Sequence, residues 1–353
     1  MYTNSYIEST GSYIPKSLIK NEAFLERIFK GKKGEVLQKS TVDVVEKLEE
    51  ITQIQERRYE MTEDTSFMAV EAGRAALEDS AFDEETIGGI IVAHNFGNIK
   101  QGSHQGHMIP NLAALVKHHM GIKNSRCFAF DVLYGCPGWL LALQQAHQHL
   151  QTQAATSVLV IGVESLSRVV NPRDVDSMLF GDGAGAVVLA AEKTATKRGI
   201  IGYDNFSDCV NEAYFLKMSK AIDSQDEHLF IDMAGRSVFK YAVTRMPQLI
   251  TELLQRLSIP VKDIKQFLFH QANGKMLEAI GQQISKLHDN ICISHKVPMT
   301  LQQLGNTSVA TIPTMLDLMK RGKMKGFQFE TGEKVVMASV GAGMHVNCMV
   351  YQY

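Results

Sequence analysis

A cysteine at the start of a predicted helix has the setting for covalent chemistry. Cys136 ends the loop 133–136 and is followed by Pro137 and by the apolar helical pattern of residues 138–150. Proline suits the first turn of a helix because its missing N–H costs nothing there. Unpaired N–H groups and the helix dipole favour an anionic sulfur at this position. We therefore expect a lowered thiol pKa and a nucleophile.

A histidine and an asparagine in the second half of the chain are candidates to act with Cys136. His270 directly follows a short predicted strand, and functional sites of α/β proteins collect at strand ends. Asn306 lies in a Gly-Asn-Thr-Ser loop, where asparagine also serves as a turn or N-cap residue. Most free cysteines are small buried hydrophobic residues. A hydrolase elbow is disfavoured because Tyr134 occupies a position that needs glycine.

Short apolar runs that suit β-strands alternate along the chain with segments of helix length. Runs rich in Val, Ile and Phe favour strands, and their alternation with helices is typical of α/β proteins. We therefore expect an α/β fold. The predicted strands are Ile90–Val92, Cys127–Val132, Ser157–Ile161, Ala186–Leu189, Phe267–Phe269 and Val335–Ala338.

The order strand, loop, helix, strand recurs on either side of about residue 195, which suggests two fused and similar halves. We place these halves at residues 1–195, with the nucleophilic cysteine, and at residues 196–353, with the histidine and the asparagine. Equivalent loops then bring Cys136 and Asn306 together at a pseudo-twofold seam. Residues 18–46 are expected to form a charged, helical surface segment.

The composition argues against several classes of function. The 36 basic and 38 acidic residues nearly cancel, so neither nucleic acid nor an anionic membrane surface is an expected partner. The sequence has no signal-peptide pattern and no apolar stretch of about 18 residues, so we expect a cytoplasmic protein without membrane insertion. Five widely spaced cysteines without a C-x-x-C pair fit neither a disulfide framework nor a zinc site. The glycine-rich run 181–185 leads into a strand, which disfavours dinucleotide binding.

Several motifs together resemble the ketoacyl-acyl carrier protein synthase III family of thiolase-superfamily condensing enzymes, over nearly the whole chain. Cysteine, histidine and asparagine occur in the order of that family, in three separated motifs. The resemblance implies the thiolase fold, with two similar halves packed as a layered α-β-α-β-α structure. The matching segments are Thr10–Pro15, Phe130–Val132 with Cys136, Leu179–Ala186, Met233–Gly235, Val238–Lys240, His270–Asn273, Gly305–Ser308 and Val340–Gly343.

The resemblance implies a Cys-His-Asn triad. Cys136 attacks an acyl thioester and becomes acylated, while His270 and Asn306 face the incoming second thioester. Decarboxylation of a malonyl thioester generates a carbanion without a strong base if hydrogen-bond donors stabilise the enolate oxygen, as His270 and Asn306 can do. By the same resemblance the backbone N–H groups of Cys136 and Ala342 form an oxyanion hole. No metal and no organic cofactor is expected.

The sequence departs from the family at the mouth of the expected active site. Members primed by a small acyl-CoA hold its adenine with a Trp and an Arg, and the matching positions here are Lys47 and Ile51. Delivery of both acyl groups by an acyl carrier protein is therefore expected. Lys240 and Lys275 match carrier-docking positions, and together with Arg236 they can neutralise the acidic face of a carrier.

The residues expected around the acyl chain also differ. In the family the loop matching residues 96–110, which includes Ile109, shapes the acyl pocket across a homodimer interface. Tyr134 and Trp139 flank the nucleophile where many members have small residues or Phe, and Phe239 is expected in the same pocket. Relatives that join two long acyl chains without decarboxylation borrow a Glu from this loop of the partner subunit, but here the loop has no acidic residue. Its H-x-x-H pair, without an acidic or cysteine neighbour, is not expected to bind metal.

These features lead us to expect a decarboxylative Claisen condensation of an acyl group on Cys136 with malonyl-acyl carrier protein, giving a 3-oxoacyl product. The alternative is a specialised ketosynthase of secondary metabolism that condenses two longer acyl thioesters, with or without cyclisation, as in dialkylresorcinol-type pathways. A third reading, a catalytically inactive thiolase-fold binding subunit, is opposed by the intact Cys136, His270 and Asn306.

Overall fold

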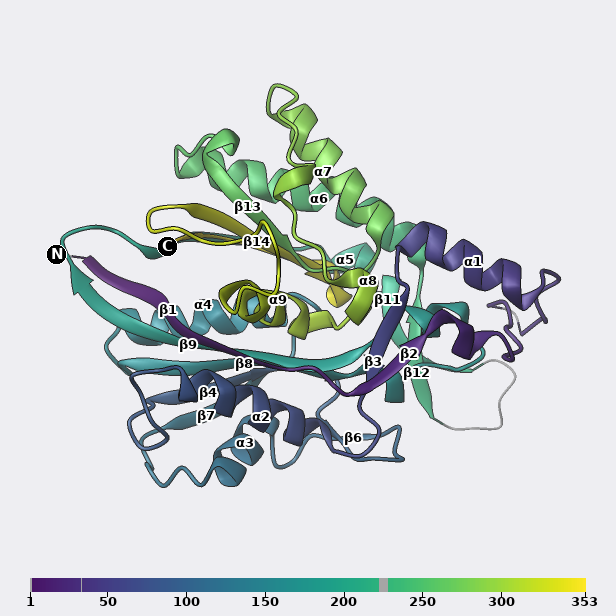
Figure 1. The fold of residues 1–353 in the computed structure, drawn as a ribbon, viewed down its shortest axis with the longest axis horizontal. Coiled ribbons are helices and arrows are strands. Elements are labelled where there is room, and N and C mark those ends of the chain that lie inside the picture. Colours follow the sequence, from purple (N-terminus) through teal and green to yellow (C-terminus); the bar gives the residue numbers. More distant parts are fainter. Residues whose placement is uncertain (1, 33, 222–227) are drawn as a thin grey trace.

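Two β-sheets form the frame of the protein in a computed structural model, which describes residues 2–32, 34–221 and 228–353 (Figure 1). The five-stranded sheet has the order β1 (Tyr2–Tyr13), β9 (Asp182–Thr194), β8 (Ser157–Ser165), β4 (Gly89–Ala93) and β7 (Phe128–Val132). The four-stranded sheet has the order β10 (Gly199–Ser207), β15 (His345–Gln352), β14 (Lys334–Gly341) and β13 (Ile264–Phe269). The predicted strands are confirmed, and most extend beyond their predicted bounds.

Helices cover both outer faces and fill the space between the sheets (Figure 1). The central pair is α4 (Gly138–Gln151) and α9 (Thr311–Lys320), the pair on the five-stranded sheet is α2 (Thr65–Glu78) and α3 (Leu112–Met120), and the pair on the four-stranded sheet is α6 (Gly235–Arg256) and α7 (Gly274–Leu287). A helix enclosed between two sheets is shielded from solvent on most sides, and eight of the ten residues of α9 are buried. The resulting five layers confirm the predicted α-β-α-β-α thiolase fold.

Four strands of each sheet follow one another in the same order, and this repeat corresponds to the internal symmetry of the sequence. Strands β1, β9, β8 and β4 follow one another in the first sheet as β10, β15, β14 and β13 do in the second. In each set two antiparallel pairs are followed by one parallel pair. The first sheet is built from residues 2–194 and the second from residues 199–352. We propose the division at residue 195 on this basis.

The remaining strands and helices surround this frame. They are β2 (Ser17–Lys20), β3 (Glu56–Tyr59), β5 (Asn98–Ile99), β6 (Gly106–His107), β11 (Leu216–Lys220), β12 (Leu229–Met233), α1 (Thr41–Thr52), α5 (Cys209–Glu212) and α8 (Leu301–Leu304). Short 3₁₀ turns η7 (Ser308–Ala310) and η8 (Ala342–Met344) border the site described below. Among the described residues, none of the helices has the length and apolar character needed to span a membrane.

The predicted surface helix over residues 18–46 is wrong for most of its length. Its first residues form β2, which pairs with β3, and a regular helix begins only at Thr41. Phe24 and Phe29 are buried in the core, so the segment is held by packing and is not a solvated insertion. The many charged residues of the segment suggested a solvent-exposed helix. The sequence pattern did not indicate that its two aromatic residues are buried.

Candidate active site

The Cys136 loop lies against the C-terminal turn of the chain. Gly135 has φ +63°, a left-handed conformation that favours glycine. A Cβ on Gly135 would lie 2.7 Å from the backbone nitrogen of Ala342, and a Cβ on Gly341 would lie 2.4 Å from that of Cys136. Only glycines allow this approach, and it brings together the two N–H groups predicted for the oxyanion hole. Helix α4 then begins at Gly138, with Pro137 as its N-cap.

His270 reaches the same place from the end of β13. Its backbone N–H donates to the carbonyl of Ala338 on β14 at 2.9 Å, which continues the parallel strand pairing for one residue. The side chain is buried, and burial lowers the pKa of the imidazole to about 4, while a hydrogen bond to the backbone of Ser308 acts in the opposite direction. The imidazole is therefore neutral at physiological pH and can serve as a hydrogen-bond donor.

Asn306 is fixed by backbone bonds between the two halves. Its N–H donates to the carbonyl of Leu179 at 2.8 Å, and its own carbonyl accepts from the N–H of Gly181 at 3.0 Å. Its side-chain Oδ1 accepts a hydrogen bond from the N–H of Ser308 at 2.9 Å. With the oxygen engaged, the Nδ2 group is directed away from the turn, so it is the end of the amide that can donate to a substrate oxygen.

Ser308 contacts all three predicted site residues, although sequence reasoning did not identify it. Its backbone bonds to Asn306 and lies beside the His270 imidazole, and its hydroxyl lies near the Cys136 thiol, whose pKa it lowers. Its φ is +48°, which is uncommon for a residue with a Cβ. Strain of this kind persists where the surrounding structure holds it, often at functional sites. The one sequence signal was its place in the Gly-Asn-Thr-Ser loop.

The predicted lowering of the Cys136 pKa is wrong. Burial raises the pKa of the thiol to about 11; the Ser308 hydrogen bond opposes this rise, and the nearby Glu164 carboxyl adds to it. The helix-start rule assumes a fully solvated sulfur, whereas Cys136 is only partly exposed. Glu164 was also missed, although an acid at the end of the apolar run 158–163 was a visible signal.

Two cavities meet at the sulfur of Cys136. The larger, about 530 Å³, is lined by His270, Asn306 and the start of α6, and we call it the triad cavity. The smaller, about 330 Å³, is lined by Tyr134 and Ser308 among others and is called the inner cavity; both cavities are mainly apolar. Of the three predicted catalytic residues, only Cys136 lines both. A group attached to Cys136 can therefore occupy one cavity while a second substrate approaches through the other.

Comparisons with known proteins agree with this arrangement. Residues 130–209 match the family model described as 3-oxoacyl-[acyl-carrier-protein (ACP)] synthase III, and residues 254–353 match its C-terminal model. The beta-ketoacyl-[acyl-carrier-protein] synthase III of Coxiella burnetii is 30% identical over 348 residues, covering 97% of each chain. That of Enterobacter sp. is 33% identical over 347 residues, again 97% of each chain. The chain belongs to the 3-oxoacyl-[acyl-carrier-protein] synthase III family.

A solved structure gives the same answer at the level of the fold. The 3-oxoacyl-[acyl-carrier-protein] synthase III from Aquifex aeolicus superimposes with a TM-score of 0.81 and 27% sequence identity, covering 99% of this chain and 100% of that one. The protein is therefore an acyltransferase of the condensing-enzyme type with a thiolase fold.

The predicted acyl-pocket residues of this synthase III-family member fall in four different places. Tyr134 lines the inner cavity, where its ring stacks on His345 at 3.9 Å between centroids. Phe239 lines the triad cavity instead. Trp139 lines neither cavity, because it is 1% exposed in the core and donates to the carbonyl of Val160 at 3.4 Å. Ile109 is 91% exposed on the surface.

The three predicted docking residues lie at the start of two neighbouring helices. Arg236 and Lys240 are exposed, one turn apart on α6, and Arg236 also lines the triad cavity. Lys275, exposed in the first turn of α7, is 3.1 Å from Glu50, which also pairs with Lys47 at 2.7 Å. Exposed pairs of this kind are weak, so they leave the lysine free to exchange partners.

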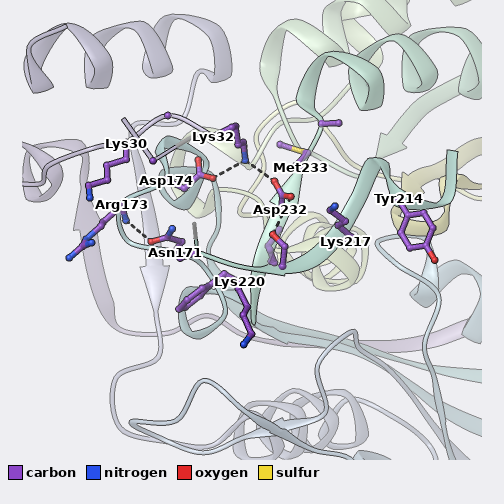
Figure 2. Close-up of a pocket in the computed structure, with 17 residues that line it drawn as sticks. Lys30, Lys32, Asn171, Arg173, Asp174, Tyr214, Lys217, Lys220, Asp232 and Met233 are labelled. Carbon is purple, nitrogen blue, oxygen red and sulfur yellow. Dashed lines mark hydrogen bonds and ion pairs between the residues drawn. The ribbon is translucent and has the colours of Figure 1, made fainter. Parts of the chain in front are cut away.

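A further pocket, whose lining residues are drawn in Figure 2, adjoins the inner cavity at β11. Lys217 lines both spaces, so this strand forms their common wall. In Figure 2 the ammonium of Lys32 lies between Asp174, at 2.8 Å, and Asp232, at 3.1 Å. The carboxyl of Asp176, 3.8 Å away, has its pKa raised to about 6 by burial and by Asp174. Lys32 thus joins the segment that precedes α1 both to Asp174 and to Asp232 of β12.

Proposed function

We propose that the protein condenses an acyl group carried on Cys136 with malonyl-acyl carrier protein and releases a 3-oxoacyl product. The main support is the position of Cys136 between two cavities, with His270 and Asn306 facing only one of them. The acyl group occupies the inner cavity, and the pantetheine arm of each substrate enters through the triad cavity.

The proposed chemistry follows from the groups around the sulfur. The Cys136 thiol attacks the acyl thioester, and the N–H groups of Cys136 and Ala342 stabilise the oxyanion that forms. Malonyl thioester then loses carbon dioxide, and the neutral imidazole of His270 and the Nδ2 group of Asn306 donate to the enolate oxygen. The enolate carbon attacks the acyl carbon and releases the Cys136 sulfur. All these groups belong to the chain, so we propose a reaction without metal or cofactor.

We propose that a carrier protein, and not CoA, delivers both acyl groups. Lys47 and Ile51 line the mouth of the triad cavity in place of an aromatic and guanidinium clamp for adenine. Arg236 lines the same cavity, and the exposed Lys240 and Lys275, near the starts of α6 and α7, add positive charge for an acidic carrier. We place this reaction in the cytoplasm, where reduced thiols fit the five free cysteines.

A homodimer is also proposed, from the exposed apolar surface around β7. This strand is the edge of the five-stranded sheet, and an exposed edge offers N–H and C=O groups to a second copy. Leu133 and Ile109 are 61% and 91% exposed nearby. Pairing of two β7 strands would cover these side chains, and a sedimentation measurement showing a monomer at micromolar concentration would contradict it.

Intact-protein mass spectrometry tests the function. The protein is incubated with acyl-CoA and acyl-carrier thioesters of increasing length and then with malonyl-carrier protein. We expect an acyl adduct on Cys136 from the carrier thioesters, its discharge by malonyl carrier, and release of carbon dioxide. The Cys136→Ala variant serves as the blank. Discharge only by a 3-oxoacyl thioester, without release of carbon dioxide, would favour the specialised ketosynthase. If no adduct forms on Cys136, both proposed enzymatic functions are contradicted.

A further inference from the structure

A buried carboxyl group lies directly behind the nucleophile. Glu164 is the penultimate residue of β8 and is 1% exposed. The Nδ2 group of Asn95 donates to Glu164 Oε1 and, at 3.2 Å, to the hydroxyl oxygen of Ser308. The Ser308 hydroxyl also lies near both the Glu164 carboxyl and the Cys136 thiol and lowers the pKa of each. Ser308 therefore lies between the sulfur and the carboxyl group.

The charge balance at this site limits how Cys136 can lose its proton. The ionisable groups facing Glu164 are Cys136, the Asp182 carboxyl on β9 and, through Ser308, the neutral His270. Releasing the thiol proton to solvent would place a second buried anion beside the carboxylate, which is costly. Transferring that proton to Glu164 leaves the pair with a single negative charge. The buried pair thus favours internal transfer over release.

Building on the proposed acyl transfer, we propose that Glu164 holds the Cys136 proton, received through Ser308, for as long as the sulfur is acylated. As the sulfur attacks, its proton passes to the Ser308 oxygen while the Ser308 proton passes to Glu164. The bond from the acyl carbon to the pantetheine sulfur breaks, and the departing thiolate takes a proton from solvent through the open triad cavity. When condensation breaks the bond to Cys136, the stored proton returns and Glu164 is again a carboxylate.

The acid strengths of the neighbouring groups agree with this route. Burial raises the pKa of Glu164 to about 8, although Asn95 and Ser308 lower it, so the carboxylate that accepts the proton becomes the major form only above about pH 8. The pKa of His270 is lowered to about 4, so its imidazole is a much weaker base than the carboxylate. A proton leaving the thiol is therefore held better by Glu164 than by His270. Glu164 acts through Ser308 and is a positioning residue, not one that touches substrate.

Two rates measured on the same variants test the proposal: acylation of Cys136 by an acyl-carrier thioester, and alkylation of Cys136 by iodoacetamide, each from pH 6 to 10. For Glu164→Gln we expect acylation to fall by about 100-fold, the scale of lost proton transfer. Alkylation should stay equal or become faster, since a nearby negative charge has been removed. Wild-type acylation should rise through about pH 8, and the variant should lose that inflection.

Matched variants separate the proposal from simpler explanations. Ser308→Ala should slow acylation as Glu164→Gln does, and Glu60→Gln, the same change at another buried glutamate, should leave both rates unchanged. If Glu164→Gln keeps the wild-type acylation rate, or if both of its rates fall together, the proton-holding role is overturned. If the wild-type protein is not acylated by any thioester, the proposed function fails and this inference fails with it.

Discussion

The backbone N–H of Ser308 donates a 2.9 Å hydrogen bond to Oδ1 of Asn306, and this bond orients the amide so that Nδ2 can donate into the triad cavity. The same residue touches the imidazole through its backbone and the thiol through its side chain. A single strained turn thus sets the relative positions of the groups that bind the enolate and the group that carries the acyl chain.

Exchanging the Asn306 amide for a carboxylate should separate the two half-reactions. In Asn306→Asp the donor Nδ2 is lost and an acceptor replaces it, so the enolate oxygen meets negative charge. We expect condensation to fall by about 100-fold to 1,000-fold, as when one oxyanion donor is lost. Acylation of Cys136, followed by intact mass, should stay within a few-fold of wild type. Equal loss of both steps would place Asn306 in the structure of the site and not in enolate binding.

The neutral state of His270 should make the folded protein sensitive to acid. The unfolded chain binds a proton near the ordinary pKa of 6.5, whereas the folded imidazole does so only near 4. Stability is therefore lost as the pH falls from about 6.5 toward 4, by about 2 to 3 kcal/mol at the acid end. Urea unfolding at pH 7 and pH 4.5 measures this loss. His270→Asn should lose less over the same window, and an identical loss would refute the assignment.

Gly341 is needed for space and not for an unusual backbone conformation. Its φ of −166° is extended, but a Cβ there would lie 2.4 Å from the Cys136 nitrogen. Gly341→Ala should displace the nucleophile loop, cost about 1 to 3 kcal/mol of stability and slow acylation strongly. Gly281→Ala, within α7 and 3.9 Å from its nearest neighbour, is the matched control. That control should keep full activity and gain slightly in thermal stability.

Reversing the charge of the docking lysines should affect carrier-borne substrates alone. For Lys240→Glu with Lys275→Glu we expect the KM for malonyl-carrier protein to rise about tenfold, with kcat nearly unchanged. The KM for a free pantetheine thioester should not change, and the difference should shrink at high salt. Lys286→Glu, near the other end of α7, is the control. A similar rise for both kinds of substrate would place these lysines inside the binding path.

The sequence predicted which residues meet in the site better than it predicted their pKa values. Cys136, His270 and Asn306 lie together because each follows or precedes an element whose type was readable from its apolar pattern. Ser308 and Glu164 were missed because their importance lies in contacts across the seam, between residues 144 positions apart. The direction of the Cys136 pKa was wrong for a related reason, since enclosure by distant residues outweighs the local effect of a helix start.

Packing also explains the errors around the site. Trp139 follows the nucleophile closely in sequence, but the first turn of α4 directs it into the core. The segment 18–46 looked solvated because charged residues are spread along its whole length, yet Phe24 is 0% exposed. Whether such an aromatic side chain is buried depends on the residues that pack against it. A single sequence does not show which residues these are.

The sharing of one sulfur by two cavities has a kinetic consequence. The acyl chain can remain in the inner cavity, but both pantetheine arms must use the triad cavity, and they cannot do so at once. The first product must depart before the second substrate binds, which is a ping-pong order. Double-reciprocal plots at several fixed concentrations of one substrate should then be parallel. An excess of the malonyl thioester should inhibit by occupying the unacylated enzyme.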